Sequence, residues 1–333
     1  MLDTIPGGAR TLALLLTFAG AACAGLIAVP ILRRLKIGQT VRDDGPATHL
    51  KKTGTPTMGG VIFIIPAAIV LAFFALREFR LIPPILVTVG FGLVGFVDDF
   101  LKVRRKSKDG LTARQKTIGL LTFATLFSAF AAFSPSVGTF MYLPLTGLSG
   151  GITLPFWIYI PFTVFVMYST SNAVNLTDGV DGLASSVTAI VAASFAVAAT
   201  IGVRDEGSAG VFAAAFAGGC LGFLLFNAHP ARVIMGDCGS LALGGAVSAA
   251  AVMMRIHWII LFFGAIYVAE ALSVVIQVAY FKRTGGRRIF KMSPIHHHFE
   301  LSGWGEGRIV FVFCAVTVAM CLAGFGLLFG RLF

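Results

Sequence analysis

Apolar runs, each about as long as a membrane helix, alternate with short polar segments along almost the whole chain. The hydrocarbon core of a bilayer is about 30 Å thick, so a helix needs roughly 20 apolar residues to cross it. The pattern predicts an all-α integral membrane protein, with a single polytopic domain over residues 1–333. About ten transmembrane helices are predicted, at residues 11–33, 58–77, 81–101, 117–134, 152–171, 182–202, 208–228, 237–254, 257–280 and 309–330.

One boundary in this series decides the side of the membrane on which every later loop lies. Residues 117–177 carry no charge at all. We divide this stretch between Ser134 and Gly151, because Ser, Pro and Gly cluster there and favour a loop over a helix. Without the division the chain would have nine spans.

The distribution of Lys and Arg favours ten spans. The loops that follow spans 1, 3, 5, 7 and 9 contain 20 of the 26 basic residues. Positive residues concentrate in cytoplasmic loops, so these five loops are predicted to face the cytoplasm, with both termini outside. Nine spans would instead separate the polar motifs described below onto two faces, and a single site could not form.

Composition excludes several classes of protein. With 57% apolar and 12% charged residues, the chain lies far from soluble domains, in which about a quarter of residues are charged. Orientation in the membrane accounts for most of the net charge of +11, and attraction of an anionic substrate or lipid is a second interpretation. Nucleic-acid binding is not expected, because the sequence has no basic segment interleaved with aromatic residues. The five cysteines form no Cys-x-x-Cys pair and indicate neither a disulfide nor a metal site.

Five short polar motifs lie at the ends of the apolar spans, on the predicted cytoplasmic face. They are His49–Gly60, Val97–Phe100, Asn175–Gly182, Met235–Ser240 and Ser293–Glu300. An ion-coupled transporter would instead carry its acids near the middle of the bilayer, and often an internal repeat. Carboxylates, amides and histidines at one water interface favour an enzyme that acts on an anionic headgroup. The active site is therefore predicted at the cytoplasmic face.

Three aspartates in these motifs are candidates for a cation site. Asp98 and Asp99 lie at the end of the third span, and Asp237 lies at the start of the eighth. Adjacent carboxylates repel each other and tend to recruit a cation, and Mg²⁺ binds through one or two carboxylates together with substrate phosphates. The structural alternative is a solvated helix end neutralised by neighbouring basic residues such as Lys102. Adjacent helical positions point about 100° apart, so Asp98 and Asp99 are not expected to share one role.

Two further motifs are candidates for substrate contacts. Asn175, Asp178 and Asp181 recur every three residues and would lie on one face of a helix. A capped helix start would explain only one of them. His296–His298 are three consecutive histidines, which cannot easily bind one metal, and no spaced ligand completes a zinc set. The functional interpretation is that these histidines contact a phosphate or transfer a proton. The alternative is that the loop is only polar and has no role in the chemistry.

Glu270 is the one acid well inside a predicted span, with Gln277 two turns later. An acid within the membrane is a functional candidate by default. It could instead pair with a backbone group or hold helices together, so its role stays open.

Taken together, the motifs resemble the polyprenyl-phosphate N-acetylhexosamine 1-phosphate transferases, from about Gly38 to Glu306. The Asp-Asp pair, Asn-x-x-Asp-Gly-x-Asp-Gly and Gly-Asp-x-Gly-Ser are shared across that superfamily. The segments Gly54–Gly60 and Pro294–Glu300 are more specific. They resemble the branch that uses UDP-N-acetylmuramoyl-pentapeptide, whereas relatives that use UDP-N-acetylglucosamine carry a different histidine loop.

The resemblance implies a reaction in the bacterial inner (cytoplasmic) membrane. Phospho-N-acetylmuramoyl-pentapeptide passes from its UDP carrier to undecaprenyl phosphate, UMP leaves, and lipid I of peptidoglycan synthesis forms. Mg²⁺ is the implied cofactor and a homodimer the implied assembly. Catalytic roles fall on Asp98, Asp99 and Asp237, with Asp237 as the metal ligand. The implied substrate-binding residues are Lys51, Lys52, Thr57, Asn172, Asn175, Asp178, Asp181, Asn227, Gln277, His296, His297 and His298.

Three roles for Asp98 stay open: general base, nucleophile in a two-step reaction, and electrostatic positioning. A phosphate monoester has its second pKa near 6, so the lipid phosphate hardly needs a base at neutral pH. Phosphoryl transfer depends mainly on positioning and on neutralising charge between two anions. The alternative functions are a sister transferase that uses UDP-N-acetylglucosamine and, more remotely, the ion-coupled transporter.

Overall fold

The computed structural model describes residues 7–34, 54–105, 107, 109–144, 146–202 and 207–329, and its long elements are helices. Each of the ten predicted spans overlaps one long helix of these residues. The helices are α1 (Gly8–Arg34), α3 (Val61–Ala75), α4 (Ile82–Arg105), α5 (Ala113–Phe133), α6 (Phe156–Thr177), α7 (Leu183–Ile201), α8 (Ser208–Asn227), α9 (Gly236–Met253), α11 (Ala265–Arg283) and α13 (Glu306–Phe329).

Eight of these helices are long and apolar enough to cross a membrane. The other two long helices of the described residues, α3 and α6, do not meet this criterion, for different reasons. Helix α3 has only 15 residues. Helix α6 is long enough, but its last turns contain Ser169, Ser171, Asn172 and Asn175, which lower its mean hydropathy.

The charge-free stretch is divided as predicted, with one feature that the all-α expectation did not include. Helix α5 ends at Phe133 and α6 begins at Phe156. Between them, strands β1 (Phe140–Tyr142) and β2 (Gly151–Thr153) pair antiparallel, with a 3-10 turn, η3 (Gly147–Ser149), in the loop. The backbone N–H of Tyr142 donates to the carbonyl of Arg255, which ties this hairpin to the end of α9.

Short helical elements complete the described chain: η2 (Phe79–Leu81), η4 (His257–Ile259), α10 (Ile260–Phe263) and α12 (Ile295–Glu300). The predicted ninth span therefore begins too early. Its first residues form η4 and α10, the chain turns at Gly264, and the continuous helix α11 starts at Ala265.

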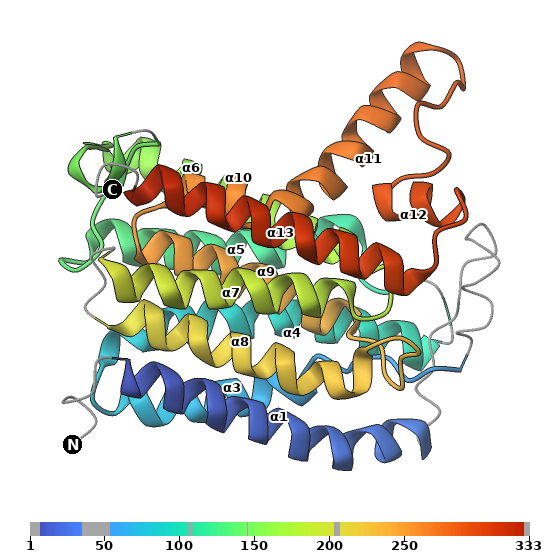
Figure 1. Cartoon of the computed structure of the whole chain (residues 1–333), viewed down its shortest axis with the longest axis horizontal. Helices are drawn as coiled ribbons and strands as arrows, with labels where there is room; N and C mark the ends of the chain where they lie inside the picture. The colour runs from blue at the N-terminus through green and yellow to red at the C-terminus, as the bar shows by residue number, and fades with distance from the viewer. Residues whose placement is uncertain are drawn as a thin grey trace.

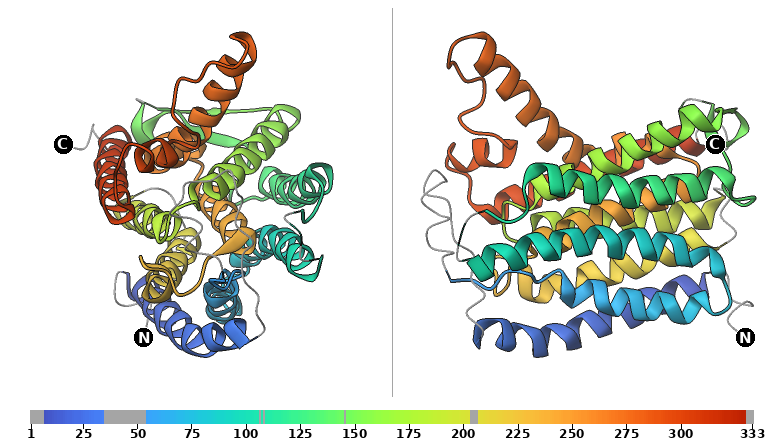
Figure 2. Two further views of the ribbon diagram at one scale, coloured as in Figure 1. Left: turned by 90° about the vertical axis from the view of Figure 1, so that its right-hand side faces the viewer. Right: turned by 180° about the vertical axis from the view of Figure 1, so that it is seen from behind.

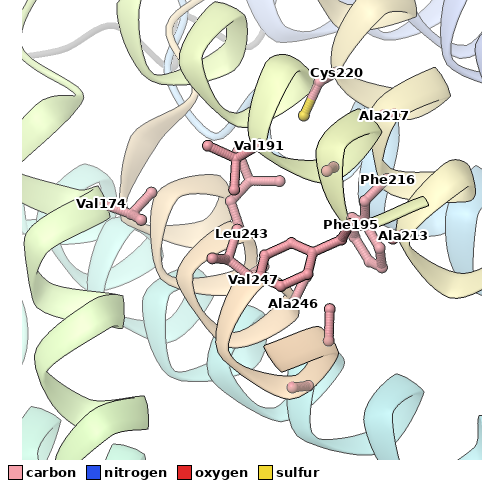
Figure 3. Packing of buried hydrophobic residues seen from close by; sticks show 14 of the residues in the cluster. Val174, Val191, Phe195, Ala213, Phe216, Ala217, Cys220, Leu243, Ala246 and Val247 are labelled. Carbon is pink, nitrogen blue, oxygen red and sulfur yellow. The ribbon is translucent and has the colours of Figure 1, made fainter. Parts of the chain in front are cut away.

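The core lies where α6, α7, α8 and α9 meet. Side chains such as Phe195, Phe216, Leu243 and Val247 interlock there (Figure 3). In α8 and α9, 83% and 89% of the apolar window is buried, against 28% in α1, α5, α11 and α13. The second group of helices therefore presents most of its apolar surface outward, as expected of helices that contact lipid.

The helices run roughly parallel to one long axis, and the start of α1 and the end of α13 lie at the same end of the bundle (Figure 1). The ends of α4 and α6 and the starts of α9 and α13 gather at the opposite end, which we call the motif end. Helix α11 leans away from the other helices as it approaches the motif end (Figures 1 and 2). Because the start of α1 and the end of α13 lie at the same end of the bundle, the chain between them crosses it an even number of times.

Candidate active site

Three carboxylates from two helices meet at the motif end. Asp98 and Asp99 lie near the end of α4, and Asp237 lies in the first turn of α9, which packs along α4. One ligand oxygen from each residue lies within 4.8 Å of the other two. The structure thus brings together the three residues for which the sequence indicated a cation site.

Each of these carboxylates has one oxygen held by a fixed donor. Asp98 Oδ1 accepts from the backbone N–H of Leu111 at 2.7 Å, and Asp99 Oδ2 accepts from that of Cys238 at 3.0 Å. Asp237 Oδ1 accepts from the side-chain amide of Asn175 at 2.8 Å. These donors come from the α4–α5 loop, α9 and α6, so three separate elements fix the orientation of the acids.

The second oxygen of each carboxylate points to a common position, where the ammonium of Lys102 lies. Lys102 Nζ contacts Asp98 Oδ2 most closely, then Asp237 Oδ2 at 3.0 Å and Asp99 Oδ1 at 3.7 Å. Lys116 Nζ reaches the same Asp237 oxygen at 2.9 Å. Three carboxylates are therefore opposed by two ammonium groups, and the contacts leave one formal negative charge unbalanced.

The segment before α3 closes one side of this cluster. The N–H of Gly59 donates to the carbonyl of Ile234 at 2.9 Å, and that of Ile234 to the carbonyl of Pro56 at 2.8 Å. This pairing sets the buried Thr57 against Gly236, which has φ +72°. A Cβ on Gly236 would lie 2.5 Å from Asp99 Oδ2 and 2.9 Å from Thr57 Oγ1, so only glycine fits both the backbone conformation and the space.

Asn175 and Asp181 occupy different parts of the same region. Asn175 also donates to Ser240 Oγ at 2.8 Å, so it braces the first turn of α9 while it holds Asp237. Asp181 Oδ2 accepts from the backbone N–H of Ala231 at 3.0 Å and lies 3.3 Å from His229 Nδ1. The N–H of Asp181 donates to Glu306 Oε2 at 3.1 Å, which forms a second group of possible ligands, Asp181, His229 and Glu306. Asp178 follows directly after the last residue of α6.

Two other predicted substrate-binding residues, Asn172 and Asn227, make hydrogen bonds within the protein itself. Asn172 donates to the carbonyl of Tyr168 within α6. Asn227 accepts from Ser185 and donates to the carbonyl of Val233. Their roles toward a substrate stay predictions. Lys51 and Lys52 lie outside the described residues.

The three consecutive histidines lie in the short helix α12, and not in an irregular loop as the sequence suggested. We keep the name histidine loop for Ser293–Glu300; it contacts α11 through Glu270. His296 Nδ1 lies 3.1 Å from Glu270 Oε1, and the His296 backbone N–H donates to Oε2 at 3.5 Å. His296 is 1% exposed and Glu270 0%. The other ring nitrogen, Nε2, has no hydrogen-bond partner among the described residues and faces Gly179, where a Cβ would lie only 2.2 Å away. The role that the sequence left open for Glu270 is thus, in this structure, to pair with the histidine loop.

His297, His298 and Gln277 also make local contacts. His297 Nδ1 lies 2.7 Å from Glu300 Oε2, and His298 Nδ1 accepts from the backbone N–H of Lys291. Gln277 Oε1 accepts from the N–H groups of Ile289 and Phe290. These residues shape the chain between α11 and α12 at the motif end.

Sequence reasoning missed Lys116, His229 and Glu306 as members of these clusters. Each lies far along the chain from its partners, so no local spacing marks it. The sequence offered one signal for Lys116: it directly precedes the charge-free span 117–134, on the predicted cytoplasmic face.

Comparison with known proteins shows the family to which the chain belongs. A profile of glycosyl transferase family 4 matches residues 81–255, and a phospho-N-acetylmuramoyl-pentapeptide-transferase signature matches residues 52–64. A phospho-N-acetylmuramoyl-pentapeptide-transferase of Acetivibrio thermocellus is 53% identical over 312 residues, which cover 93% of each chain. That of Carboxydothermus hydrogenoformans is 47% identical over 320 residues, covering 95% of this chain and 98% of the relative.

The membrane-spanning helices and the matching profile identify a multi-pass membrane transferase of glycosyl transferase family 4. Within this class, the chain belongs to the phospho-N-acetylmuramoyl-pentapeptide-transferase family. The resemblance drawn from the motifs is confirmed, and membership of an enzyme family rules out the transporter interpretation.

Proposed function

We propose that this chain transfers phospho-N-acetylmuramoyl-pentapeptide from its UDP carrier to undecaprenyl phosphate, releasing UMP and forming the first lipid intermediate of peptidoglycan synthesis. Membership of the phospho-N-acetylmuramoyl-pentapeptide-transferase family supports the choice of these two substrates. The observation that carries the chemistry is the shared position onto which Asp98, Asp99 and Asp237 each direct one oxygen.

The donor set at this position fits Mg²⁺. Hard divalent cations prefer carboxylate oxygens and complete their coordination with water and substrate phosphates. Lys102 Nζ lies among the three oxygens, and this position of a positive charge supports a cation site there. Asp237, Asp98 and Asp99 would hold the ion once Lys102 turns toward a substrate phosphate. When bound, Mg²⁺ would neutralise charge on the phosphates and polarise the bond that breaks.

The contacts of Asp98 favour positioning over proton transfer. One of its oxygens accepts from the backbone of Leu111 and the other contacts Lys102. A carboxylate with both oxygens engaged is poorly placed to remove a proton, and the lipid phosphate is largely ionised at neutral pH. We therefore assign Asp98 to orienting Lys102 and the cation against the attacking phosphate.

The two lysines would balance the charge of the two anionic substrates. Lys116 is held by Asp237 and Lys102 by all three acids, so both ammonium groups lie where phosphates must approach each other. We propose that Thr57 and the neighbouring Lys51 and Lys52 contact the nucleotide phosphates, and that Asp178, Asp181 and the histidine loop contact the rest of the UDP substrate.

We also propose that the motif end faces the cytoplasm of a bacterial inner membrane, with ten crossings, both termini outside and a homodimer as the assembly. The concentration of basic residues at this end supports the orientation. A cysteine-accessibility experiment on intact cells would test the orientation, with reporter cysteines at the exposed Arg105 and Phe79. Labelling of the Arg105 position from outside the cell would contradict it.

The function is tested by UMP release from the purified protein in detergent, with undecaprenyl phosphate and Mg²⁺. UDP-N-acetylmuramoyl-pentapeptide and UDP-N-acetylglucosamine are supplied separately. We expect release only from the first. Release only from the second would assign the chain to the sister reaction, and release from neither by folded protein would refute the proposal.

A further inference from the structure

The outer half of α11 leaves the bundle. The buried residues of the whole helix are Ile266, Tyr267, Glu270, Ser273 and Gln277. Every residue from Val278 to Arg283 is exposed. Figure 2 shows the helix and the following loop standing away from the other helices. The exposed side chains of this half include Val275, Val278 and Phe281, which are suited to hydrocarbon and not to water.

The end of this projecting helix and its following loop carry a dense positive charge. We call the set the basic tip; it consists of Lys282, Arg283, Arg287, Arg288 and Lys291, all of them exposed. The sequence from Lys282 to Lys291 contains no Asp or Glu, and no ion pair joins these cations to an acid of the described chain. The apolar side chains of Phe281 and Ile289, 43% and 48% exposed, lie among the cations.

We propose that the basic tip binds the headgroups of anionic phospholipids of the surrounding bilayer. A helix that leaves the bundle among lipids brings its last turn to the level of the headgroups at the motif end. Basic side chains there can reach phosphates while their alkyl stems stay on the apolar surface. Clusters of Lys and Arg beside a membrane helix bind anionic lipid in this way, and exposed Phe and Ile add apolar contact.

The tip is joined directly to the candidate active site. The side chain of Gln277 accepts from the N–H groups of Ile289 and Phe290 and donates to the carbonyl of Phe290. The backbone N–H of Lys291 donates to His298, and Lys291 Nζ donates to the carbonyl of Leu301 just after α12. Anionic lipid that immobilises the tip would therefore also order the histidine loop.

Hydrogen exchange in nanodiscs tests the binding without relying on catalysis. The amides of residues 284–292 are compared in phosphatidylcholine discs with and without added phosphatidylglycerol. Each basic residue near an anionic surface changes lipid binding roughly fivefold, so a double neutralisation should weaken binding by about 25-fold. We expect phosphatidylglycerol to slow exchange at the tip in the original chain and not in the Arg287→Gln/Arg288→Gln variant.

The matched control removes the same charge at the opposite end of the bundle, with Arg77→Gln/Arg80→Gln, and should keep the slowing at the tip. A Lys282→Gln/Arg283→Gln variant should repeat the loss seen with Arg287 and Arg288. Equal exchange in the two disc types, or slowing that survives both tip variants, would overturn the proposal. Slowing caused by undecaprenyl phosphate or UDP in phosphatidylcholine discs, but not by phosphatidylglycerol, would assign the tip to a substrate and overturn it as well.

Discussion

Replacing Glu270 tests whether the buried acid of α11 positions the histidine loop. In a Glu270→Leu variant, the His296 Nδ1–H and backbone N–H both lose their acceptor inside the protein. In a Glu270→Gln variant, the side-chain amide oxygen can still accept from Nδ1–H. The two variants therefore separate loss of the contact from loss of the charge.

The size of the effect follows from burial. Both side chains are almost fully buried, and a hydrogen bond to a charged group contributes about 1.5–3 kcal/mol. Helix α12 has only six residues, so we expect it to undock while the bundle stays folded. At about 1.4 kcal/mol per factor of ten, the Leu variant should raise KM for the UDP substrate by roughly 10–150-fold. The Gln variant should raise it only a few-fold.

The assay is UMP release at saturating undecaprenyl phosphate, with kcat and KM determined separately and Tm measured on the same preparations. Glu78→Gln is the control. This half-buried glutamate in the turn between α3 and α4 accepts from the backbone N–H of Arg80, which an amide oxygen can still do, so kcat, KM and Tm should change little. An unchanged KM in folded Glu270→Leu protein would show that the pair does not position the loop. A fall in Tm with no change in KM would make Glu270 purely structural.

The carboxylate cluster supports three further predictions. Asp237→Asn should abolish Mg²⁺-dependent UMP release while circular dichroism shows a folded protein; retained turnover would remove Asp237 from the catalytic centre. Gly236→Ala forces a side chain into a left-handed backbone, which costs about 1–2 kcal/mol before the clash with Asp99 is counted. It should lower both Tm and kcat, and wild-type values would contradict the close packing. Lys116→Met should lower kcat/KM at least roughly tenfold, about 1.4 kcal/mol, and Lys116→Arg should restore part of it; equal activity in both variants would refute a role for the charge.

The helices could be predicted from the sequence because lipid imposes a length and a composition on each span. Even the division between Ser134 and Gly151 followed from local turn chemistry, and the structure has its hairpin there. The start of α11 could not be found in the same way. Residues His257–Phe263 are as apolar as a membrane helix, and the break at Gly264 depends on how these side chains pack.

The site was predictable in part, for a similar reason. Asp98, Asp99 and Asp237 stand in motifs at span ends, so topology alone brings them to one end of the bundle. The pairing of Glu270 with His296 and the approach of Lys116 to Asp237 depend on which helices are neighbours and how they are rotated. The spacing of residues along the chain does not reveal which helices are neighbours or how they are rotated. The role of Glu270 therefore could not be predicted from the sequence.

Whether Asp98, Asp99 and Asp237 form one cation site can be measured by metal binding to the purified protein. Binding of Mn²⁺, as a paramagnetic substitute for Mg²⁺, would be measured by electron paramagnetic resonance on the purified protein with UDP present. We predict binding that is lost in Asp237→Asn and retained in Glu306→Gln, which alters the separate group around His229. Undiminished binding in Asp237→Asn, or loss in Glu306→Gln alone, would show that the three aspartates do not hold the cation.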